Sequence, residues 1–502
     1  MKKLSFLFIL SILLYKNELY SQTKELVLSA IKGKTSRPET LKIPGNLIPA
    51  EIHISGERAD FFKVELIHQK ENALITFQPS GDFTGIAKAT LKIKTDHILL
   101  TGLSTNGLEG ENEAPLSQIV DALGYKTEIG WTTLANHLRP ELQGDELPPS
   151  LFKKAGTGNV EMIPLARYSP DFLLNFGYYT PTGHGPNQFH VGVLAKAKQF
   201  PEHQILFPGL ASGKKEFDPQ DKAFGFYAIS PSHTAYSEDI WNILFYPSHA
   251  THAVRVFPVK DKTGNLIKNN YLVCFEEAAN GDYNDYVFLL KNIQPVDLKD
   301  QFTSLFNGNN FDGWYTWLEK QGKNADPGKV FTVEKDGIIH DTGEELGYIM
   351  TQKRYTNYHF GLEFKWGLKR WPPRENNKRD SGICYHVPDD AEDKIWPSSV
   401  ECQIQEGDVG DFWLLDNATI QVDGKQNAPS AHTQIIKKKD AEKPTGEWNT
   451  VEVLSFNGKC VHIVNGVVVN YGENASLAGG RILLQSEYAE IYYRNIQLRE
   501  LK

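Results

Sequence analysis

The strongest constraint on the fold lies in the last two hundred or so residues, where short runs of alternating apolar and polar residues follow one another closely. At least ten such runs occur after residue 302, and none of that region keeps apolar residues at the 3.6-residue spacing of a helix. Asn465-Gly466 separates two of these runs, and this dipeptide is a strong hairpin signal. The pattern predicts an all-β jelly-roll sandwich of two sheets over residues 301–502.

The rest of the chain also predicts β-structure. Residues 23–97 contain short strand-like runs separated by Pro-Gly and Ser-Gly turns, which are typical of an immunoglobulin-like sandwich. Residues 98–296 predict a second β-rich domain with one short helix over 114–123, ended by Gly124. A chain of 502 residues is long enough for three domains of this kind.

Residues 1–22 are typical of a secretory signal peptide. Two lysines precede a short apolar stretch, and Ser21 supplies the small residue expected near a cleavage point. We therefore expect an exported protein, periplasmic or extracellular, with no membrane span in the mature chain. The formal net charge of −9 argues against nucleic acid as a partner.

One strand-like run after residue 398 carries an unusual polar face. Read with a period of two, its apolar residues fall on one face and its polar residues on the other, as Val400, Cys402, Ile404 and Glu401, Gln403, Gln405 respectively. One carboxylate and two carboxamides in a row offer directed hydrogen-bond donors and acceptors. Trp396 and Trp413 flank the run, and indole rings can stack on sugar faces. This face therefore predicts a sugar-binding groove.

The last domain resembles the 3-keto-disaccharide hydrolase family. The segments that carry the resemblance are Ser304–Trp314, Asp380–His386, Val400–Gln405, and Ile482–Ser486 with Glu490–Ile496. Their order and spacing agree over about 40% of the chain. The resemblance implies a concanavalin-like sandwich that acts on glycosides oxidised at C3. Asp380 departs from the family pattern, in which Asn is more usual, and the segment 406–411 marks a subgroup.

A ketone at C3 of a sugar acidifies the C2–H bond, so a base can remove that proton and the C1 substituent can leave by elimination, with water addition completing a net hydrolysis. Glu401 is the expected base, and His386 is a second acid or base. Lys365 either polarises the ketone or pairs with Glu363 on the same strand face. The remaining residues expected to bind substrate are Glu363, Arg379, Asp380, Gln403, Gln405, Asp408, Trp396, Trp413 and Gln485.

The acidic run near residue 280 is a second candidate site. Asp282, Asn284 and Asp285 supply hard oxygens of the kind that calcium prefers, and the run resembles the acidic D-Y-N-D-x-V-F ending of secreted bacterial β-sandwich domains. A solvated turn before a strand is the alternative. Calcium is the cofactor expected in this domain, and no Cys/His spacing suggests zinc.

Two other functions remain open on the sequence alone. The same fold class serves non-catalytic carbohydrate-binding modules, and the front domains would suit a surface-adhesion protein. A carboxylate, a histidine and a lysine converging on one groove would favour the enzyme. Cys384 and Cys402 could form a disulfide if their strands are neighbours.

Overall fold

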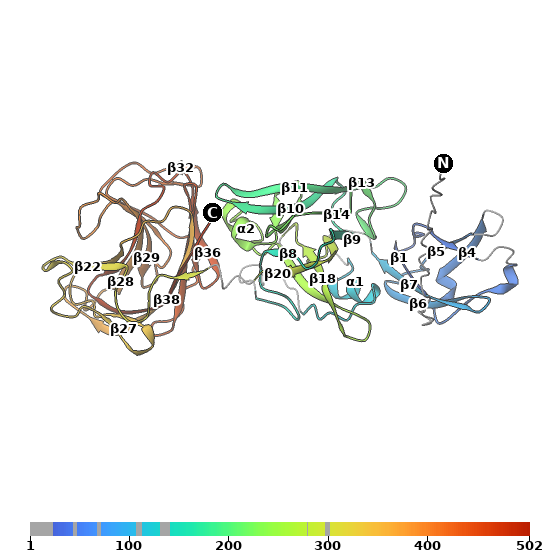
Figure 1. Cartoon of the computed structure of the whole chain (residues 1–502), viewed down its shortest axis with the longest axis horizontal. Coiled ribbons are helices and arrows are strands. Elements are labelled where there is room, and N and C mark those ends of the chain that lie inside the picture. Colours follow the sequence, from blue (N-terminus) through green and yellow to red (C-terminus); the bar gives the residue numbers. More distant parts are fainter. Residues whose placement is uncertain are drawn as a thin grey trace, which may run out of the picture. The chain divides into compact units, whose positions relative to one another are not determined.

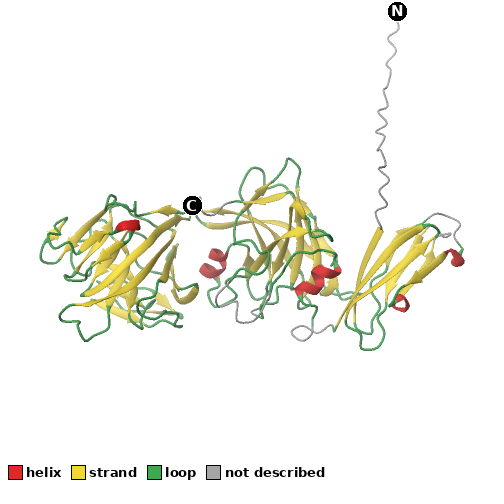
Figure 2. Cartoon of the chain, turned by 90° about the horizontal axis from the view of Figure 1, so that it is seen from below, coloured by secondary structure: helices red, strands yellow, loops and turns green. Residues whose placement is uncertain are grey.

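The computed structural model describes residues 24–43, 48–67, 72–106, 113–130, 141–278, 280–296 and 302–501. Strands dominate this part of the chain, and its α-helices are two short ones, α1 (Leu116–Ala122) and α2 (Asp239–Phe245) (Figure 2). The all-β fold expected from the sequence is confirmed, and α1 lies within the helix predicted for 114–123. The expected signal peptide, residues 1–22, lies outside the described residues.

The first unit, up to Thr105, is a small sandwich of seven strands. One sheet has the order β1 (Lys24–Ile31), β7 (Asp96–Thr105), β6 (Gly85–Ile93) and β3 (Ile52–Ser55). The other has the order β2 (Glu39–Lys42), β5 (Asn72–Phe77) and β4 (Phe62–Ile67). Because β7 pairs with both β1 and β6, this unit extends past residue 97, where the sequence placed its end.

The second unit contains the middle and C-terminal domains. The first sheet of the middle domain has the order β13 (Leu210–Gly213), β11 (Gly185–Leu194), β10 (Leu174–Thr182), β15 (Gly225–Ile229) and β16 (Thr234–Tyr236). The second has the order β12 (Gln204–Leu206), β9 (Val160–Tyr168), β19 (Tyr286–Lys291), β18 (Leu266–Phe275) and β17 (Val254–Lys260), with β14 (Glu216–Phe217) on β9. A small ribbon pairs β8 (Phe152–Lys154) with β20 (Ile293–Pro295).

Two eight-stranded antiparallel sheets build the C-terminal domain (Figure 1). The first contains β24 (Phe331–Val333), β25 (Ile339–Asp341), β38 (Ala489–Glu500), β27 (Tyr358–Arg370), β34 (Asn449–Phe456), β35 (Lys459–Val464) and β36 (Val467–Gly472), with β21 (Thr303–Ser304) on β38. The second has the order β23 (Gly322–Lys323), β22 (Trp314–Leu318), β26 (Gly347–Thr351), β37 (Arg481–Ser486), β28 (Asp380–Val387), β29 (Ser399–Gln405), β30 (Phe412–Leu415) and β33 (His432–Ile435). A ribbon of β31 (Gln421–Val422) and β32 (Lys425–Gln426) lies beside them. The predicted jelly-roll sandwich and the hairpin at Asn465-Gly466 are both confirmed.

The core of this domain lies between the two sheets. Val400, Cys402 and Ile404 of β29 point into it, together with Ile383 and Tyr385 of β28. The alternation of side chains along a strand therefore sends Glu401, Gln403 and Gln405 to the opposite face, away from the core. This second face of the β28–β29 sheet carries the site described below.

All four cysteines are free and buried. Cys384 and Cys402 lie on neighbouring strands, but Cys402 pairs with Ile383, one residue out of register with Cys384. Because successive side chains alternate between faces, the two sulfur atoms lie on opposite sides of the sheet. The disulfide that the sequence left open is therefore absent.

An apolar cluster joins the middle domain to the C-terminal one within the second unit. Trp241 of α2 lies 5.4 Å from Phe456 of β34, measured between ring centroids, at 79° between the ring planes. Leu454 and Val461 belong to the same cluster. The C-terminal domain therefore buries apolar surface against its neighbour, so experiments on it call for the full chain.

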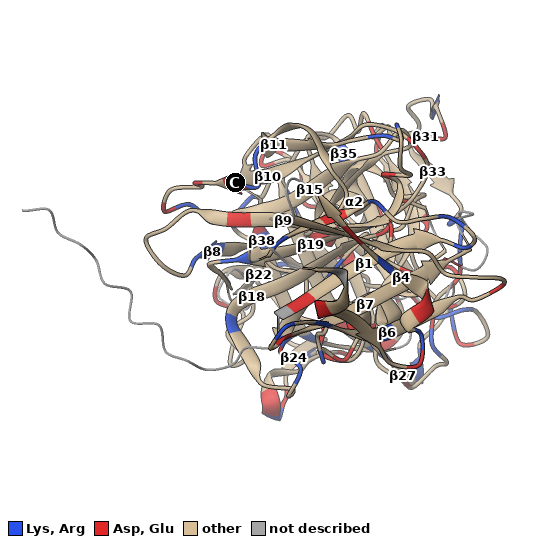
Figure 3. Cartoon of the chain, turned by 90° about the vertical axis from the view of Figure 1, so that its right-hand side faces the viewer, with Lys and Arg blue, Asp and Glu red and all other residues tan. Residues whose placement is uncertain are grey.

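No helix among the described residues is both long and apolar enough to cross a membrane. Acidic and basic positions are interspersed along the ribbon in the view of Figure 3.

Candidate functional site

A cavity of about 330 Å³ opens on the outward face of the β28–β29 sheet. This volume lies in the range of small-molecule sites. Its walls combine acidic, amide and indole side chains from three strands and the loops around them. We call it the acid cavity, and it is lined by Arg374, Asp380, Trp396, Glu401, Gln403, Gln405, Trp413, Leu415, Ala431, His432 and Glu487.

Glu401 lies at the buried floor of the acid cavity, with 4% of its surface exposed. A methyl group added to Gly382 on β28 would meet the Oε1 atom of Glu401 at 2.0 Å and the Oε1 atom of Gln485 at 2.2 Å. Both oxygen atoms therefore converge over the bare backbone of Gly382. The sequence predicted roles for Glu401 and Gln485 separately, and the fold brings them together.

Three carboxyl groups share the acid cavity, and their burial disfavours the charged forms. Burial, followed by the charge of Glu487, raises the pKa of Asp380 to about 8, although nearby Arg374 opposes the rise. Burial also raises the pKa of Glu401 well above its ordinary value, and the charges of Glu487 and Asp380 raise it further. Such a carboxyl group accepts a proton more readily than an exposed one.

Arg374 and Trp396 hold two of these carboxyl groups in place. Arg374 forms an ion pair with Asp380, and its Nη2 atom lies 3.6 Å from the Oε2 atom of Glu487. The Nε1–H group of Trp396 donates a hydrogen bond of 2.9 Å to Glu487. The Nε2–H group of Gln405 donates to Asp380 at 2.7 Å. The walls of the cavity are thus fixed by directed contacts.

Several polar atoms in and beneath these walls are buried without a hydrogen-bond partner within the described part of the chain. They are Oδ1 of Asp380, Oε1 of Gln403, Oε1 of Gln485 and Nε1 of Trp413. Leaving a buried polar atom unpaired costs about 1–3 kcal/mol each, so such atoms are rare in folded proteins. Three buried acceptors and one buried donor therefore lie around this cavity.

His386, expected as a second acid or base at the site, lies apart from Glu401. Its backbone has a positive φ of 62°, which breaks the alternation of β28 and turns the ring into the core. The ring is fully buried, and its Nε2 atom lies 2.8 Å from the hydroxyl of Ser455 on the other sheet. Burial lowers the pKa of His386 to about 4, so the ring is neutral near pH 7. The structure therefore gives His386 no route to the cavity floor.

Lys365 and Glu363 lie on β27, in the sheet that does not carry the acid cavity. The Nζ atom of Lys365 lies 5.1 Å from the centre of the Trp448 ring, a cation–π contact. Glu363 accepts a hydrogen bond of 2.6 Å from Arg494 rather than pairing with Lys365. Both of these residues are therefore removed from the site that the sequence assigned to them.

Arg379 and Asp408 also lie outside the acid cavity. The Nη1 atom of Arg379 donates to Glu406 at 2.7 Å, and Lys378 donates to Asp408 at 2.6 Å. These contacts hold the turn after β29. Of the nine residues expected to bind substrate, five line the cavity, namely Asp380, Gln403, Gln405, Trp396 and Trp413, and Gln485 reaches its floor.

The sequence reading missed Arg374, Glu487 and His432. Glu487 follows Gln485 at a spacing of two, so extending the period of β37 by one step could have found it. His432 begins β33, a short edge strand without an apolar pattern. Arg374 lies in a loop, for which hydrophobic periodicity gives no signal.

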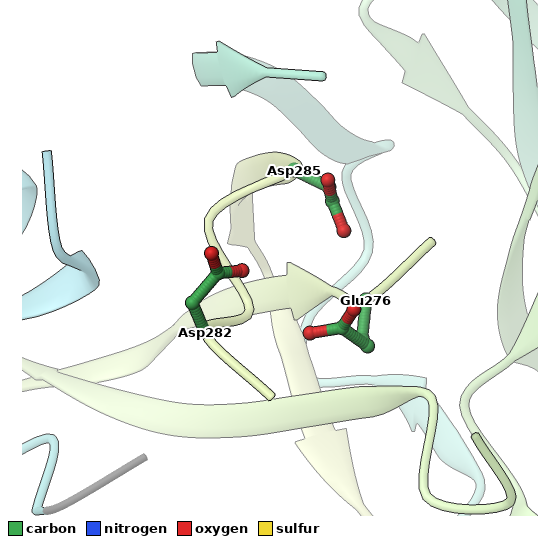
Figure 4. Close-up of side chains that lie close together, drawn as sticks. All are labelled: Glu276, Asp282 and Asp285. Carbon is green, nitrogen blue, oxygen red and sulfur yellow. The ribbon is translucent and has the colours of Figure 1, made fainter. Parts of the chain in front are cut away.

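A second group of carboxylates lies in the middle domain (Figure 4). Glu276 follows the last residue of β18 and Asp285 precedes the first residue of β19, so the two strand ends bring them together with Asp282. Oxygen atoms of the three side chains lie within 4.8 Å of one another. The sequence predicted Asp282 and Asp285 here but passed over Glu276, and the third predicted ligand, Asn284, lies between them with its Oδ1 atom unpartnered in the described structure.

These oxygen atoms fit a calcium ion, which takes six to eight hard oxygen ligands from flexible loops. Burial and the charge of Asp282 raise the pKa of Glu276 to about 7, and burial with the charge of Glu276 raises the pKa of Asp285 well above its ordinary value. A divalent cation would offset the repulsion among these groups. Glu276, Asp282 and Asp285 would hold it and so tie the β18–β19 loop.

Comparisons with known proteins concern the C-terminal domain. Residues 301–499 match a family described as the 3-keto-alpha-glucoside-1,2-lyase-like domain. A 3-keto-disaccharide hydrolase of Bacteroides thetaiotaomicron is 26% identical over 187 residues, which cover 34% of this chain and 57% of that protein. The match thus spans little more than half of that relative.

Two solved structures each align with about two fifths of the chain. A candidate glycosyl hydrolase from Parabacteroides distasonis is 20% identical, has a TM-score of 0.29, and is covered to 95% by 41% of this chain. SCLam, a non-specific endo-β-1,3(4)-glucanase of family GH16, is 10% identical, has a TM-score of 0.28, and is covered to 95% by 42% of this chain.

Proposed function

We propose that the C-terminal domain, which belongs to the 3-keto-alpha-glucoside-1,2-lyase-like family, cleaves glycosides whose sugar ring carries a ketone at C3. The proposed reaction takes place in the acid cavity. The lining of the cavity carries the proposal, because its carboxyl and amide groups can hydrogen-bond sugar hydroxyls and its indole rings can pack against the faces of a sugar. Residues 1–22 support the further proposal that the protein is exported.

In the proposed reaction Glu401 removes the proton from C2. The C2–H electrons form an enolate with the C3 ketone, and the enolate then expels the C1 substituent with its bonding electrons. The raised pKa of Glu401 makes it a stronger base than an exposed carboxylate, provided that it is ionised. Water addition to the unsaturated product would complete a net hydrolysis.

Arg374 takes the role that the sequence assigned to Lys365. It is the one arginine or lysine among the residues that line the acid cavity, so its guanidinium group can stabilise the negative charge that develops on the C3 oxygen. Gln403 and Gln405 line the cavity, where their amide groups can hydrogen-bond sugar hydroxyls.

A conventional glycosidase is the second candidate, because it needs two carboxyl groups and the acid cavity holds three. In that reaction one carboxyl group protonates the leaving oxygen and another acts at C1, so no ketone is needed. An unoxidised glycoside would then be a substrate. A binding module without catalysis would retain either sugar and cleave neither.

The proposal is tested with Glu401→Gln in the full chain. The carboxamide keeps the shape of the side chain but cannot take a proton, so kcat on a 3-keto-glucoside should fall by about a hundredfold or more. Glu363→Gln is the matched control, because it makes the same chemical change on the other sheet and keeps an acceptor for Arg494. Full activity of Glu401→Gln, or an equal loss in both variants, would remove Glu401 from the reaction.

A further inference from the structure

A second cavity of about 550 Å³ adjoins the acid cavity and extends the groove along the sheet. Trp317 forms part of its wall, with its ring stacked on Tyr348 at 5.3 Å between centroids and 20° between planes. Asp393 also lines it and accepts hydrogen bonds of 2.7 Å from both Tyr315 and Tyr348. An indole face beside a fixed carboxylate is a suitable surface for a sugar ring.

The two cavities share one wall, made by Trp396, Ala431 and His432. Trp396 is half exposed, and its hydrogen bond to Glu487 fixes the ring between the two spaces. His432 pairs in register with Leu415 of β30, and Leu415 lines the acid cavity, so the histidine side chain lies on the same face of the sheet. Among these three residues, His432 alone has a side chain that can transfer a proton.

We infer that the second cavity binds the leaving sugar of a disaccharide-like substrate and that His432 protonates the glycosidic oxygen as the C1–O bond breaks. The inference rests on the proposed function. If the keto-sugar occupies the acid cavity over Glu401, the bond to the next sugar must cross the shared wall. The group that meets the leaving oxygen is then the imidazole at that wall rather than the buried His386.

The proton inventory of this step is balanced. Glu401 holds the proton from C2, and the electrons of the breaking C1–O bond go to the leaving oxygen. Protonated His432 donates its proton to that oxygen and becomes neutral, so the second sugar leaves as an alcohol. His432 is exposed, so it can regain a proton from solvent. Imidazole is the side chain most often used for such transfers.

The test compares leaving groups in His432→Gln. A 3-keto-glucoside of p-nitrophenol releases a stable anion and needs no acid, whereas a 3-keto-disaccharide releases a sugar alcohol that does. We expect the variant to keep most of its activity on the nitrophenyl substrate and to lose about a hundredfold on the disaccharide. His359→Gln, on β27 in the other sheet, is the matched control and should change neither rate.

Trp317→Ala tests the second cavity itself. It should raise KM for the 3-keto-disaccharide and leave KM for the methyl 3-keto-glucoside unchanged, since a methyl group does not reach the second cavity. The assignment of His432 would be overturned if His432→Gln lost activity equally on the nitrophenyl substrate and on the 3-keto-disaccharide, or lost activity on neither. If the wild-type protein cleaves neither keto substrate, the proposed function itself is wrong and this inference is wrong with it.

Discussion

Replacing Glu487 with Gln should move the pH dependence of the reaction in a predictable direction. The charge of Glu487 is the largest electrostatic cause, after burial, of the raised pKa of both Glu401 and Asp380. A base must be ionised to act, so kcat/KM falls as the pH drops below the pKa of Glu401. Removing the neighbouring negative charge lowers that pKa. The acidic limb of the pH profile should therefore shift to lower pH.

The size of the shift follows from the contacts of Glu487. Carboxyl groups that share one site change each other's pKa by about one to three units. The positive charge of Arg374, 3.6 Å from Glu487, offsets part of the field of Glu487 at Glu401, so we expect the lower end of this range. A pKa shift of about one unit equals about 1.4 kcal/mol. It raises kcat/KM of the variant about tenfold over the wild type at a pH below the acidic limbs of both proteins.

The assay is kcat/KM on a chromogenic 3-keto-glucoside from acidic to alkaline pH, which reports on groups in the free enzyme. Glu442→Gln is the control, because burial raises the pKa of Glu442 to about 7 although this residue is not among those lining the acid cavity. That variant should leave the limb in place. A limb that stays fixed in Glu487→Gln, or rises to higher pH, would refute the electrostatic account of the cavity.

Three further results are expected. Gly382→Ala should keep the fold but reduce turnover by about tenfold or more, because the added carbon displaces the ends of Glu401 and Gln485 and a misplaced base acts poorly; unchanged kcat would contradict this geometry. The pKa of Glu401 is higher in the folded protein than in the unfolded chain, so the wild-type protein loses stability as the pH rises from the unfolded-state pKa toward the folded-state pKa. Glu401→Gln, which cannot ionise, should therefore have a higher Tm than the wild type at pH 8 and an equal Tm at pH 4. Equal Tm values at both pH values would argue against a buried charge. Calcium added after chelation should raise Tm, because a calcium concentration of a hundred times Kd adds about 2.7 kcal/mol to the free energy of unfolding. Asp282→Asn should abolish this rise. No change in the Tm of the wild type would exclude calcium from the middle domain.

The polar face of β29 could be predicted because a strand alternates with a strict period of two. Once Val400, Cys402 and Ile404 were assigned to the core, Glu401, Gln403 and Gln405 had to share the other face. The same rule failed for His386, whose positive φ reverses the alternation at the end of β28. No feature of the sequence around His386 indicates a positive φ at this residue.

Assignment to the correct sheet lay beyond the sequence pattern. Glu363 and Lys365 alternate as regularly as Glu401 and Gln403, but β27 belongs to the opposite sheet, whose outer face is remote from the cavity. The pairing of strands that are distant in the chain decides which sheet a strand joins, and so which polar side chains lie beside one another. For the same reason Glu276 joins Asp282 and Asp285 only when β18 and β19 pair.

We propose that the acid cavity breaks glycosidic bonds by removing a proton from C2 of a 3-keto sugar. The most direct measurement is turnover by the full chain of a chromogenic 3-keto-glucoside, with hydrogen or deuterium at C2, beside the unoxidised glucoside. The account predicts release from the keto substrates alone, with slower release when C2 carries deuterium. Equal release from the unoxidised glucoside, with no effect of deuterium, would contradict it and favour a conventional two-carboxylate hydrolysis.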